Sequence, residues 1–192
     1  MPSDAYDLVV IGAGAAGSSV ATAAAGRGFA VALIEEWKVG GTCLNVGCDP
    51  TKALVRCAEV AHLARISSRL GIRSSGVTVD WPAVRAYVDE VIDRIRGGDG
   101  EQNLRDQGIT LIKERGKFLD GNTVQAGRRR ISADRFLVAT GARPSVPPIE
   151  GLDTVGYITS QDAVELDRLP GSVVIVGAGL IGVEFAQIFA RL

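Results

Sequence analysis

Two cysteines, Cys43 and Cys48, are the residues of this 192-residue chain whose type and spacing point most directly to chemistry. Four residues separate them, a Gly-Gly pair precedes the first, and a helical pattern follows the second. Such a pair can cycle between a dithiol and a disulfide and so transfer two electrons. The spacing alone also fits two buried thiols that only pack. A zinc site is disfavoured, because the three cysteines and the single histidine, His62, match no four-ligand spacing.

A disulfide between Cys43 and Cys48 requires a bend in the backbone between them. On a regular helix, residues five positions apart rise about 7.5 Å and point about 140° apart, so their Cα atoms lie more than about 8 Å apart. A disulfide tolerates only about 7 Å. Gly47, directly before the second cysteine, is the residue that could supply the bend.

The N-terminal region carries a dinucleotide-binding pattern. An apolar strand signal over residues 8–11 runs into Gly-Ala-Gly-Ala-Ala-Gly and then into an Ala-rich helical run. The first glycine makes a tight turn, the second lets the backbone approach a pyrophosphate at the helix N-terminus, and the third lets helix and strand pack closely. The alternative is a close-packed helix that binds nothing. The nucleotide interpretation assigns cofactor contacts to Gly12, Gly14, Ala16 and Gly17.

A second strand signal, over residues 30–34, ends at a carboxylate. Glu35 follows Gly17 by 18 residues, close to the distance of about 20 at which an acidic residue binds the ribose of a dinucleotide. Glu36 is the fallback for the same role. A glycine turn framed by two strands and an acidic residue is far more specific than a glycine turn alone.

A second glycine turn of the same design lies near the end of the chain. The apolar run Val173-Val174-Ile175-Val176 predicts a buried strand, and it is followed by Gly177, Gly179 and Gly182. Two such turns, with a dithiol after the first, imply two nucleotides and a disulfide in one electron path.

With these motifs together, the sequence resembles the pyridine nucleotide-disulfide oxidoreductases, a family that includes dihydrolipoamide dehydrogenase, glutathione reductase and mercuric reductase. The resemblance rests on both glycine turns, on the run from Gly40 to Lys52, and on Ala139-Thr140-Gly141. It implies FAD at the first turn and NADH or NADPH at the second. Hydride would pass from the nicotinamide to the flavin, and electrons would pass on to the disulfide. The resemblance also implies a homodimer.

The resemblance assigns roles to individual residues. Cys48 matches the cysteine nearer the flavin, and Cys43 matches the interchange thiol that attacks the substrate. Lys52 matches a lysine beside the flavin ring, and Glu184 matches the carboxylate that pairs with it. A lysine and a helix N-terminus both attract anions, which suits a thiolate nucleophile. The resemblance implies further cofactor contacts at Gly41, Thr42, Gly116, Lys117, Ala139, Thr140 and Gly141.

We predict an α/β fold with a doubly wound, Rossmann-like FAD-binding domain and a small β-meander over residues 1–148. A second Rossmann-like domain, for NAD(P), is expected to begin over residues 149–192. The middle of the chain predicts helices at 51–70 and 82–96, and strands at 109–113, 117–119, 123–125, 130–132 and 135–138. The chain stops before the second domain's ribose selector and before the dimerisation domain with its acid/base His-Glu pair. We therefore interpret it as a fragment or truncated product, inactive alone.

Composition limits the class of partner. The formal net charge of −1 disfavours nucleic acid and membrane surfaces. No charged-then-apolar leader is present, and no apolar stretch approaches the roughly 20 residues needed to span a bilayer. Three cysteines in such a chain predict a reducing cytoplasm and a catalytic pair, with Cys57 assigned to packing.

The electron acceptor is predicted to be a small disulfide or a thiophilic metal ion such as Hg(II). Leu180 stands where glutathione reductase has a tyrosine over the flavin, and residues 97–108 lack the pattern of dihydrolipoamide dehydrogenases. The first feature favours the dihydrolipoamide dehydrogenase or mercuric reductase branch over glutathione reductase. The second favours a mercuric-reductase-like enzyme slightly over a dihydrolipoamide dehydrogenase. Asp49 departs from the Val or Ile of familiar members. A hypothesis of another class is a non-catalytic module that binds FAD or only a protein partner.

Overall fold

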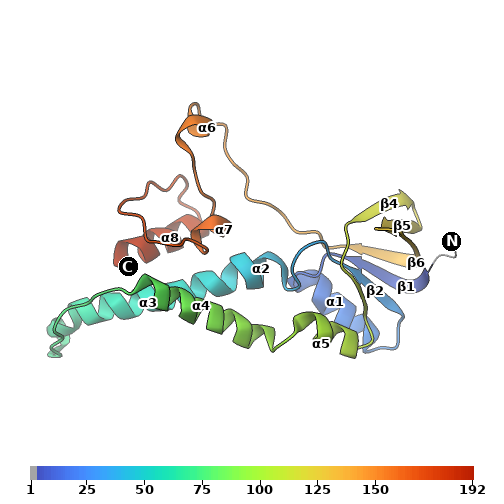
Figure 1. Ribbon diagram of the computed structural model, residues 1–192, viewed down its shortest axis with the longest axis horizontal. Coiled ribbons are helices and arrows are strands. Elements are labelled where there is room, and N and C mark those ends of the chain that lie inside the picture. Colours follow the sequence, from blue (N-terminus) through green and yellow to red (C-terminus); the bar gives the residue numbers. More distant parts are fainter. Residues whose placement is uncertain (1–3) are drawn as a thin grey trace. The chain divides into compact units, whose positions relative to one another are not determined.

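The computed structural model describes residues 4–192, which form two compact units (Figure 1). Unit 1 contains the described residues up to Asn45 together with Arg96–Arg143. Unit 2 contains Val46–Ile95 and Pro144–Leu192. The chain therefore passes from unit 1 to unit 2 inside the cysteine motif and returns at the end of a long helix. The predicted domain boundary at residue 148 stays a prediction.

Unit 1 is built on a six-stranded sheet with the strand order β3-β2-β1-β6-β5-β4. Strands β3, β2, β1 and β6 run parallel, whereas β4, β5 and β6 form an antiparallel meander. The α/β fold with a small meander is thus confirmed. The elements of unit 1 are β1 (Asp4–Ile11), α1 (Ala15–Ala25), β2 (Val31–Ile34), most of α2 (Gly41–Val46), α5 (Gly100–Asp106), β3 (Thr110–Ile112), β4 (Gly116–Asp120), β5 (Thr123–Ala126) and β6 (Arg129–Val138).

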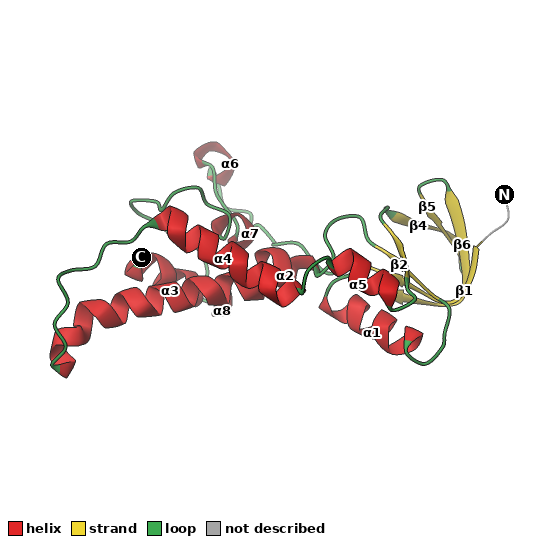
Figure 2. Cartoon of the chain, turned by 60° about the horizontal axis from the view of Figure 1, so that its bottom comes forward, coloured by secondary structure: helices red, strands yellow, loops and turns green. Residues whose placement is uncertain are grey.

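The sheet of unit 1 is covered differently on its two faces. Helices α1 and α5 lie on the same face (Figure 2), where Ala21 and Leu104 share a buried cluster with Val10 and Leu33 of the parallel strands. The meander covers the other face, with Val124 and neighbouring residues packed against Val9, Ala32, Ile34 and Ile131. Strands buried on both faces read as continuous apolar runs, which is why residues 8–11 and 31–34 show no alternation.

The parallel strands end at one common edge. The register pairs the last residue of β1 with the last residues of both β2 and β6, and the last residue of β2 with the last residue of β3. The residues that follow these strands, Gly12, Glu35, Lys113 and Ala139, therefore start from the same edge of the sheet. The carboxyl edge of a parallel sheet is where α/β proteins bind their ligands.

Unit 2 is mainly helical. Its elements are α3 (Cys48–Ile66), the 3₁₀ turn Ser67–Leu70, α4 (Trp81–Arg96, whose last residue belongs to unit 1), α6 (Leu152–Val155), α7 (Ser160–Ala163) and α8 (Leu180–Arg191). Helix α3 packs along α8, and the indole Nε1 of Trp81 donates to the Leu166 carbonyl at 2.9 Å. Gly71 closes the 3₁₀ turn in the left-handed conformation, at the predicted helix end.

The predicted strand over Val173–Val176 is not formed. These residues have no strand partner within the described chain, and Val174 and Val176 are 91% and 67% exposed. A single extended segment gains neither ladder hydrogen bonds nor a covered face, so it is not stable as a strand by itself. Two smaller differences lie in unit 1: the strands predicted at 130–132 and 135–138 are one continuous strand, β6, and helix α5 was not predicted.

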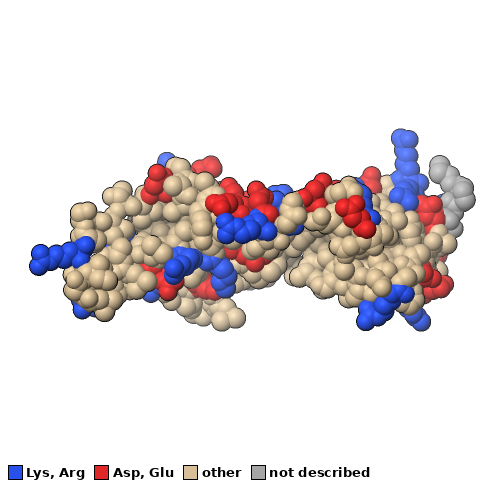
Figure 3. Space-filling model, turned by 90° about the horizontal axis from the view of Figure 1, so that it is seen from below, with Lys and Arg blue, Asp and Glu red and all other residues tan. Residues whose placement is uncertain are grey.

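Charge on the surface is mixed rather than segregated. On the face shown in Figure 3, acidic and basic side chains alternate and neither sign forms an extended field. Arg129, within the basic triplet at 128–130, is bound by Asp4, which raises the pKa of its guanidinium through hydrogen bonding. Within residues 4–192, no helix combines the length and apolar character needed to cross a membrane.

Candidate functional site

The first glycine turn connects β1 to α1. Gly12 has φ +105°, and a Cβ on this residue would lie 2.2 Å from the carbonyl oxygen of Ala139. A Cβ on Gly17 would lie 1.8 Å from the carbonyl oxygen of Gly12. Gly14 differs, since a Cβ there would meet only the Gly41 Cα, at 3.8 Å. Gly12 and Gly17 thus allow the turn to pack tightly. Gly14 leaves its backbone open to the approach of a ligand.

The N-terminus of α1 is suited to bind a phosphate group. Gly14 is the N-cap, and no side chain donates or accepts a cap hydrogen bond there. The first-turn amides belong to small residues, because Ala15 and Ala16 follow the cap and both are exposed. An uncapped helix start with small side chains can present its N–H groups and its positive dipole end to an anion. The geometry therefore fits the pyrophosphate of a dinucleotide.

Glu35 is held beside this turn by backbone hydrogen bonds. Its Oε2 accepts from the Ala13 N–H at 2.7 Å, and its Oε1 accepts from the Trp37 N–H at 2.7 Å. The residue is only 8% exposed. A carboxylate has about four acceptor positions, so these two bonds leave room for two ribose hydroxyls. Glu36 is instead exposed and faces Arg115 at 3.6 Å, so the geometry favours Glu35 for the ribose role.

The Gly-Gly pair before the first cysteine packs against the first glycine turn. The Gly40 N–H donates to the Ala13 carbonyl at 2.8 Å, and Gly40 forms a parallel bridge with Gly14. A Cβ on Gly41 would lie 2.8 Å from the Gly14 Cα. The two glycines therefore let the cysteine-bearing segment start in contact with the nucleotide turn, a contact that the sequence pattern did not reveal.

Asn45 is a site residue that sequence reasoning missed. It is buried, and its Nδ2 donates to the carbonyls of Val39 at 3.1 Å and Gly41 at 2.8 Å. Its Oδ1 accepts from Arg96 at 3.3 Å. The amide thus fixes the loop before α2 to α2 itself. The signal that could have found Asn45 is a polar residue between two apolar positions of a short helix.

The remaining residues assigned to cofactor binding in unit 1 follow the strand ends. A Cβ on Gly116 would contact the Ile11 and Ile34 side chains at 3.6 Å, which places Gly116 beside the ends of β1 and β2. Ala139 follows β6, and its N–H donates to the Ile11 carbonyl at 2.8 Å. The exposed members of this set are Thr42, Lys117, Thr140 and Gly141.

The predicted interruption between the two cysteines is present. Helix α2 ends at Val46, α3 begins at Cys48, and Gly47 between them has φ −128° and ψ −114°, which is neither helical nor extended. Cys43 is half-buried, whereas Cys48 is an exposed free thiol in the first position of α3. The backbone is thus not a continuous helix, as a disulfide between these positions requires.

Helix α3 also carries Lys52, which forms an ion pair with Glu184 of α8. The pair joins the helix that starts at Cys48 to the helix that follows the second glycine turn. The Lys52 side chain is 61% exposed and Glu184 32% exposed, so solvent screening limits the stabilisation to about 0.2–1 kcal/mol. Its significance lies in placing a cation and a carboxylate together, as the resemblance implied.

The second glycine turn repeats the geometry of the first. Gly177 has φ +113°, and a Cβ on Gly182 would lie 2.2 Å from the Gly177 carbonyl oxygen. Gly179 is the N-cap of α8, with φ −76° and ψ 179°, close to the φ −75° and ψ −172° of Gly14. No atom lies within 4 Å of a Cβ built on Gly179. The turn is therefore complete although the strand before it is not formed.

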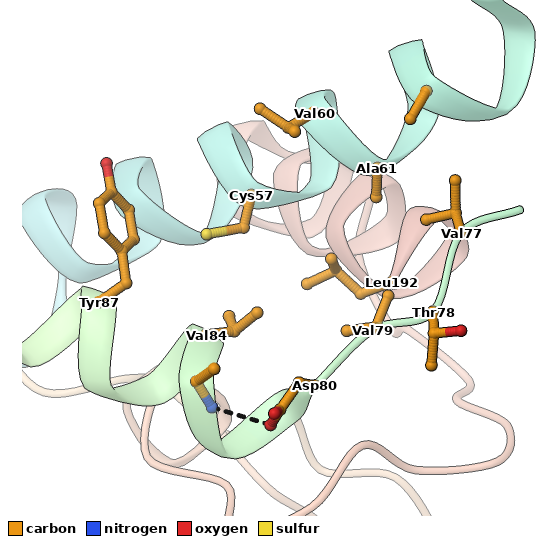
Figure 4. A pocket seen from close by; sticks show the side chains of 12 residues that line it. Cys57, Val60, Ala61, Val77, Thr78, Val79, Asp80, Val84, Tyr87 and Leu192 are labelled. Carbon is orange, nitrogen blue, oxygen red and sulfur yellow. Dashed lines mark hydrogen bonds between the residues drawn. The ribbon is translucent and has the colours of Figure 1, made fainter. Parts of the chain in front are cut away.

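Cys57 lies apart from this chemistry, in an apolar pocket of about 430 Å³ in unit 2 (Figure 4). The pocket lies between α3, the segment 77–80 and α4, and none of the residues assigned to cofactors or to the dithiol lines it. Burial raises the pKa of the Cys57 thiol. Its assignment to packing stays a prediction.

We expect Cys57 to react with iodoacetamide about tenfold more slowly than Cys48 near neutral pH, because only the thiolate is nucleophilic. A raised pKa means a smaller thiolate fraction at a given pH, so Cys57 labelling should become fast only as the medium becomes more alkaline. Peptide mass spectrometry after timed labelling measures both rates in one sample. Equal rates for the two cysteines would contradict the assignment.

A family described as pyridine nucleotide-disulphide oxidoreductase matches residues 6–192. The mercuric reductases of Lysinibacillus sphaericus and Bacillus cereus are 39% and 40% identical over 189 and 187 residues. These alignments cover 98% and 97% of this chain but only 35% and 30% of the relatives, so the chain spans about a third of their length.

A solved structure shows the same fold. It is described as the Cu(II) complex of the HOCl-induced flavoprotein disulfide reductase RclA from Escherichia coli. The TM-score is 0.80 at 34% sequence identity, with 96% of this chain and 39% of that chain covered.

Proposed function

The chain belongs to the pyridine nucleotide-disulphide oxidoreductase family, and from this premise we propose that it forms the nucleotide- and dithiol-bearing part of an FAD-dependent NAD(P)H:disulfide oxidoreductase. One observation carries the proposal: Lys52, on the helix that starts at Cys48, pairs with Glu184, on the helix that follows the second glycine turn. The pair links the helix of the dithiol to the helix of the second glycine turn, and it supports a role for both helices in one electron path.

The residues of the first turn fit FAD. Gly12, Gly14 and Gly17 form the turn, the start of α1 receives the pyrophosphate, and Glu35 receives the ribose hydroxyls. When bound, the flavin would supply the step that converts two-electron hydride transfer into reduction of a disulfide. The second turn would hold the NADH or NADPH that donates the hydride.

Four side chains of the protein would then carry out the thiol chemistry and offset the charge that develops during it. Cys43 and Cys48 would be reduced from a disulfide to two thiols, and the Cys43 thiolate would attack the acceptor. Lys52 would offset negative charge near the reacting centre, and Glu184 would hold the ammonium in place. Overall, NAD(P)H, one proton and a disulfide acceptor would give NAD(P)⁺ and two thiols.

The acceptor is proposed to be a small disulfide or a thiophilic metal ion, with a mercuric-reductase-like reaction favoured slightly over that of dihydrolipoamide dehydrogenase. With a metal acceptor, the same two electrons would reduce Hg(II) to the metal. Support comes from the mercuric reductases among the relatives and from RclA, whose structure is described as a Cu(II) complex. A cytoplasmic homodimer completes the proposal: the cysteine usage suits a reducing compartment, and the dimer is what the family resemblance implies.

The proposal is tested by flavin and thiol measurements on the purified chain. We expect a yellow protein that releases about one FAD per chain on denaturation. Mild oxidation should remove two titratable thiols, and Cys48→Ser should abolish this loss, whereas Cys57→Ser should leave it unchanged. A colourless protein whose thiols do not pair would contradict the proposal.

A second candidate function has one observation in its favour. The segment Val173–Val176 and the exposed side chains of Leu180, Ile181 and Val183 present apolar surface in unit 2. A chain with such a surface can act as a binding module without catalysis. Retention of FAD with reversible dithiol chemistry would decide against the module, whereas a flavin-free chain that forms oligomers would favour it.

A further inference from the structure

Trp37 is the more exposed of the two tryptophans and follows strand β2 and Glu35. The chain contains two tryptophans, and Trp81 is buried at 6% exposure with its Nε1 bonded to a backbone carbonyl. Trp37 is 43% exposed. Trp37 lies in the bend that follows β2, and its half-exposed ring is available to a flat ligand at the end of the sheet.

The backbone of Trp37 is held at both of its polar groups. Its N–H donates to Glu35 Oε1 at 2.7 Å, and its carbonyl oxygen accepts from the Lys113 ammonium. The other oxygen of Glu35 accepts from the Ala13 N–H of the first glycine turn. Trp37 is therefore tied, through one carboxylate, to the turn assigned to the nucleotide, and it starts from the same sheet edge.

We propose that the Trp37 indole forms the stacking surface for the adenine of the dinucleotide at the first turn. This inference rests on the proposed function. If Glu35 binds the ribose hydroxyls, the adenine must lie next to Glu35, because the base is bonded directly to that ribose. The flat, exposed ring nearest to Glu35 in the chain is Trp37, and an aromatic side chain can stack on the π-face of any base.

The Trp37 ring has a cationic neighbour in this structure. The Lys38 ammonium lies 5.4 Å from the centre of the Trp37 ring. An exposed cation–π contact is weaker than base stacking, and the lysine side chain is flexible, so an incoming adenine can displace it.

The two tryptophans provide the test. In the full chain after its FAD has been removed, ADP serves as the probe because it carries adenine, ribose and phosphates but no flavin that could accept excitation energy. With Trp81→Phe, ADP should quench the remaining Trp37 fluorescence saturably, whereas with Trp37→Phe the Trp81 emission should not change. Trp37→Ala should weaken ADP binding about tenfold and lower the FAD content, and Trp37→Phe should bind nearly as well as the unmodified chain.

Failure of the inference and failure of the proposed function give different results. If FAD and ADP bound normally, Trp37→Ala had unchanged affinity and Trp37 was not quenched, the stacking role would be wrong and the proposed function would stand. If neither FAD nor ADP bound the unmodified chain, both would fall. A change only in oligomeric state with Trp37→Ala, measured by light scattering, would assign the residue to a protein interface instead.

Discussion

Gly17→Ala should eliminate flavin from the purified protein. The new Cβ would lie 1.8 Å from the Gly12 carbonyl oxygen and 3.0 Å from its carbonyl carbon. Both atoms belong to the backbone of the turn, so no side chain can move aside and the turn itself must open. We expect a cost of about 3 kcal/mol, which corresponds to about a hundredfold loss of FAD affinity. Absorbance of flavin released on denaturation measures the effect.

Gly182→Ala is the matched control. It introduces the same contact at the second turn, with a Cβ 2.2 Å from the Gly177 carbonyl oxygen. Because this turn belongs to unit 2 and is assigned to NAD(P), the FAD content should stay near that of the unmodified chain. Circular dichroism verifies that both variants fold. Equal flavin loss in both variants would show that the two turns do not bind separate nucleotides as proposed.

Glu35→Ala should cause the second large effect. The substitution removes the acceptor of the Ala13 and Trp37 N–H groups, and the carboxylate that receives them is 8% exposed. Hydrogen bonds to a charged group contribute about 1.5–3 kcal/mol each. We therefore expect about 3 kcal/mol lower stability of unit 1 and a loss of FAD affinity of about a hundredfold. Chemical unfolding and equilibrium flavin titration measure the two quantities.

Two further variants separate charge from hydrogen bonding. Glu35→Gln keeps one acceptor oxygen but turns an N–H₂ group toward one of the two backbone donors, so its losses should be intermediate. Glu36→Ala removes an exposed side chain whose only described partner is Arg115 at 3.6 Å, and should change stability by less than about 0.5 kcal/mol. If Glu36→Ala lost flavin and Glu35→Ala did not, the ribose role would belong to Glu36.

Several features could be predicted because they depend on neighbouring residues. Each glycine turn needs a positive φ at its first glycine, Gly12 or Gly177. Each also needs a third glycine, Gly17 or Gly182, at which a Cβ would collide with the backbone of the turn. Only glycine meets either requirement. The helix break at Gly47 followed from the disulfide length limit. Resemblance, not spacing, supplied the Lys52–Glu184 pair, since its partners lie 132 residues apart.

Other features could not be predicted from local pattern. The contact between Gly41 and Gly14 and the two donors to Glu35 depend on how β1 and β2 are placed side by side. Helix α5 follows a Gly-Gly-Asp-Gly stretch that indicates a turn, yet Asp99 caps it through the N–H groups of Glu101 and Gln102, and buried Leu104 fixes it to the sheet.

The amino-acid sequence by itself determined where the chain turns and where the helix between the two cysteines breaks, and it identified the candidate residues for the nucleotides and for the dithiol, because these depend on φ preferences, spacing and residue chemistry. Only the tertiary structure decided which apolar runs become strands. Residues 8–11 are a strand because β2 and β6 supply partners on both sides. Residues 173–176 have the same apolar character but no partner among the described residues, and a strand's hydrogen bonds and buried faces are both supplied by its neighbours.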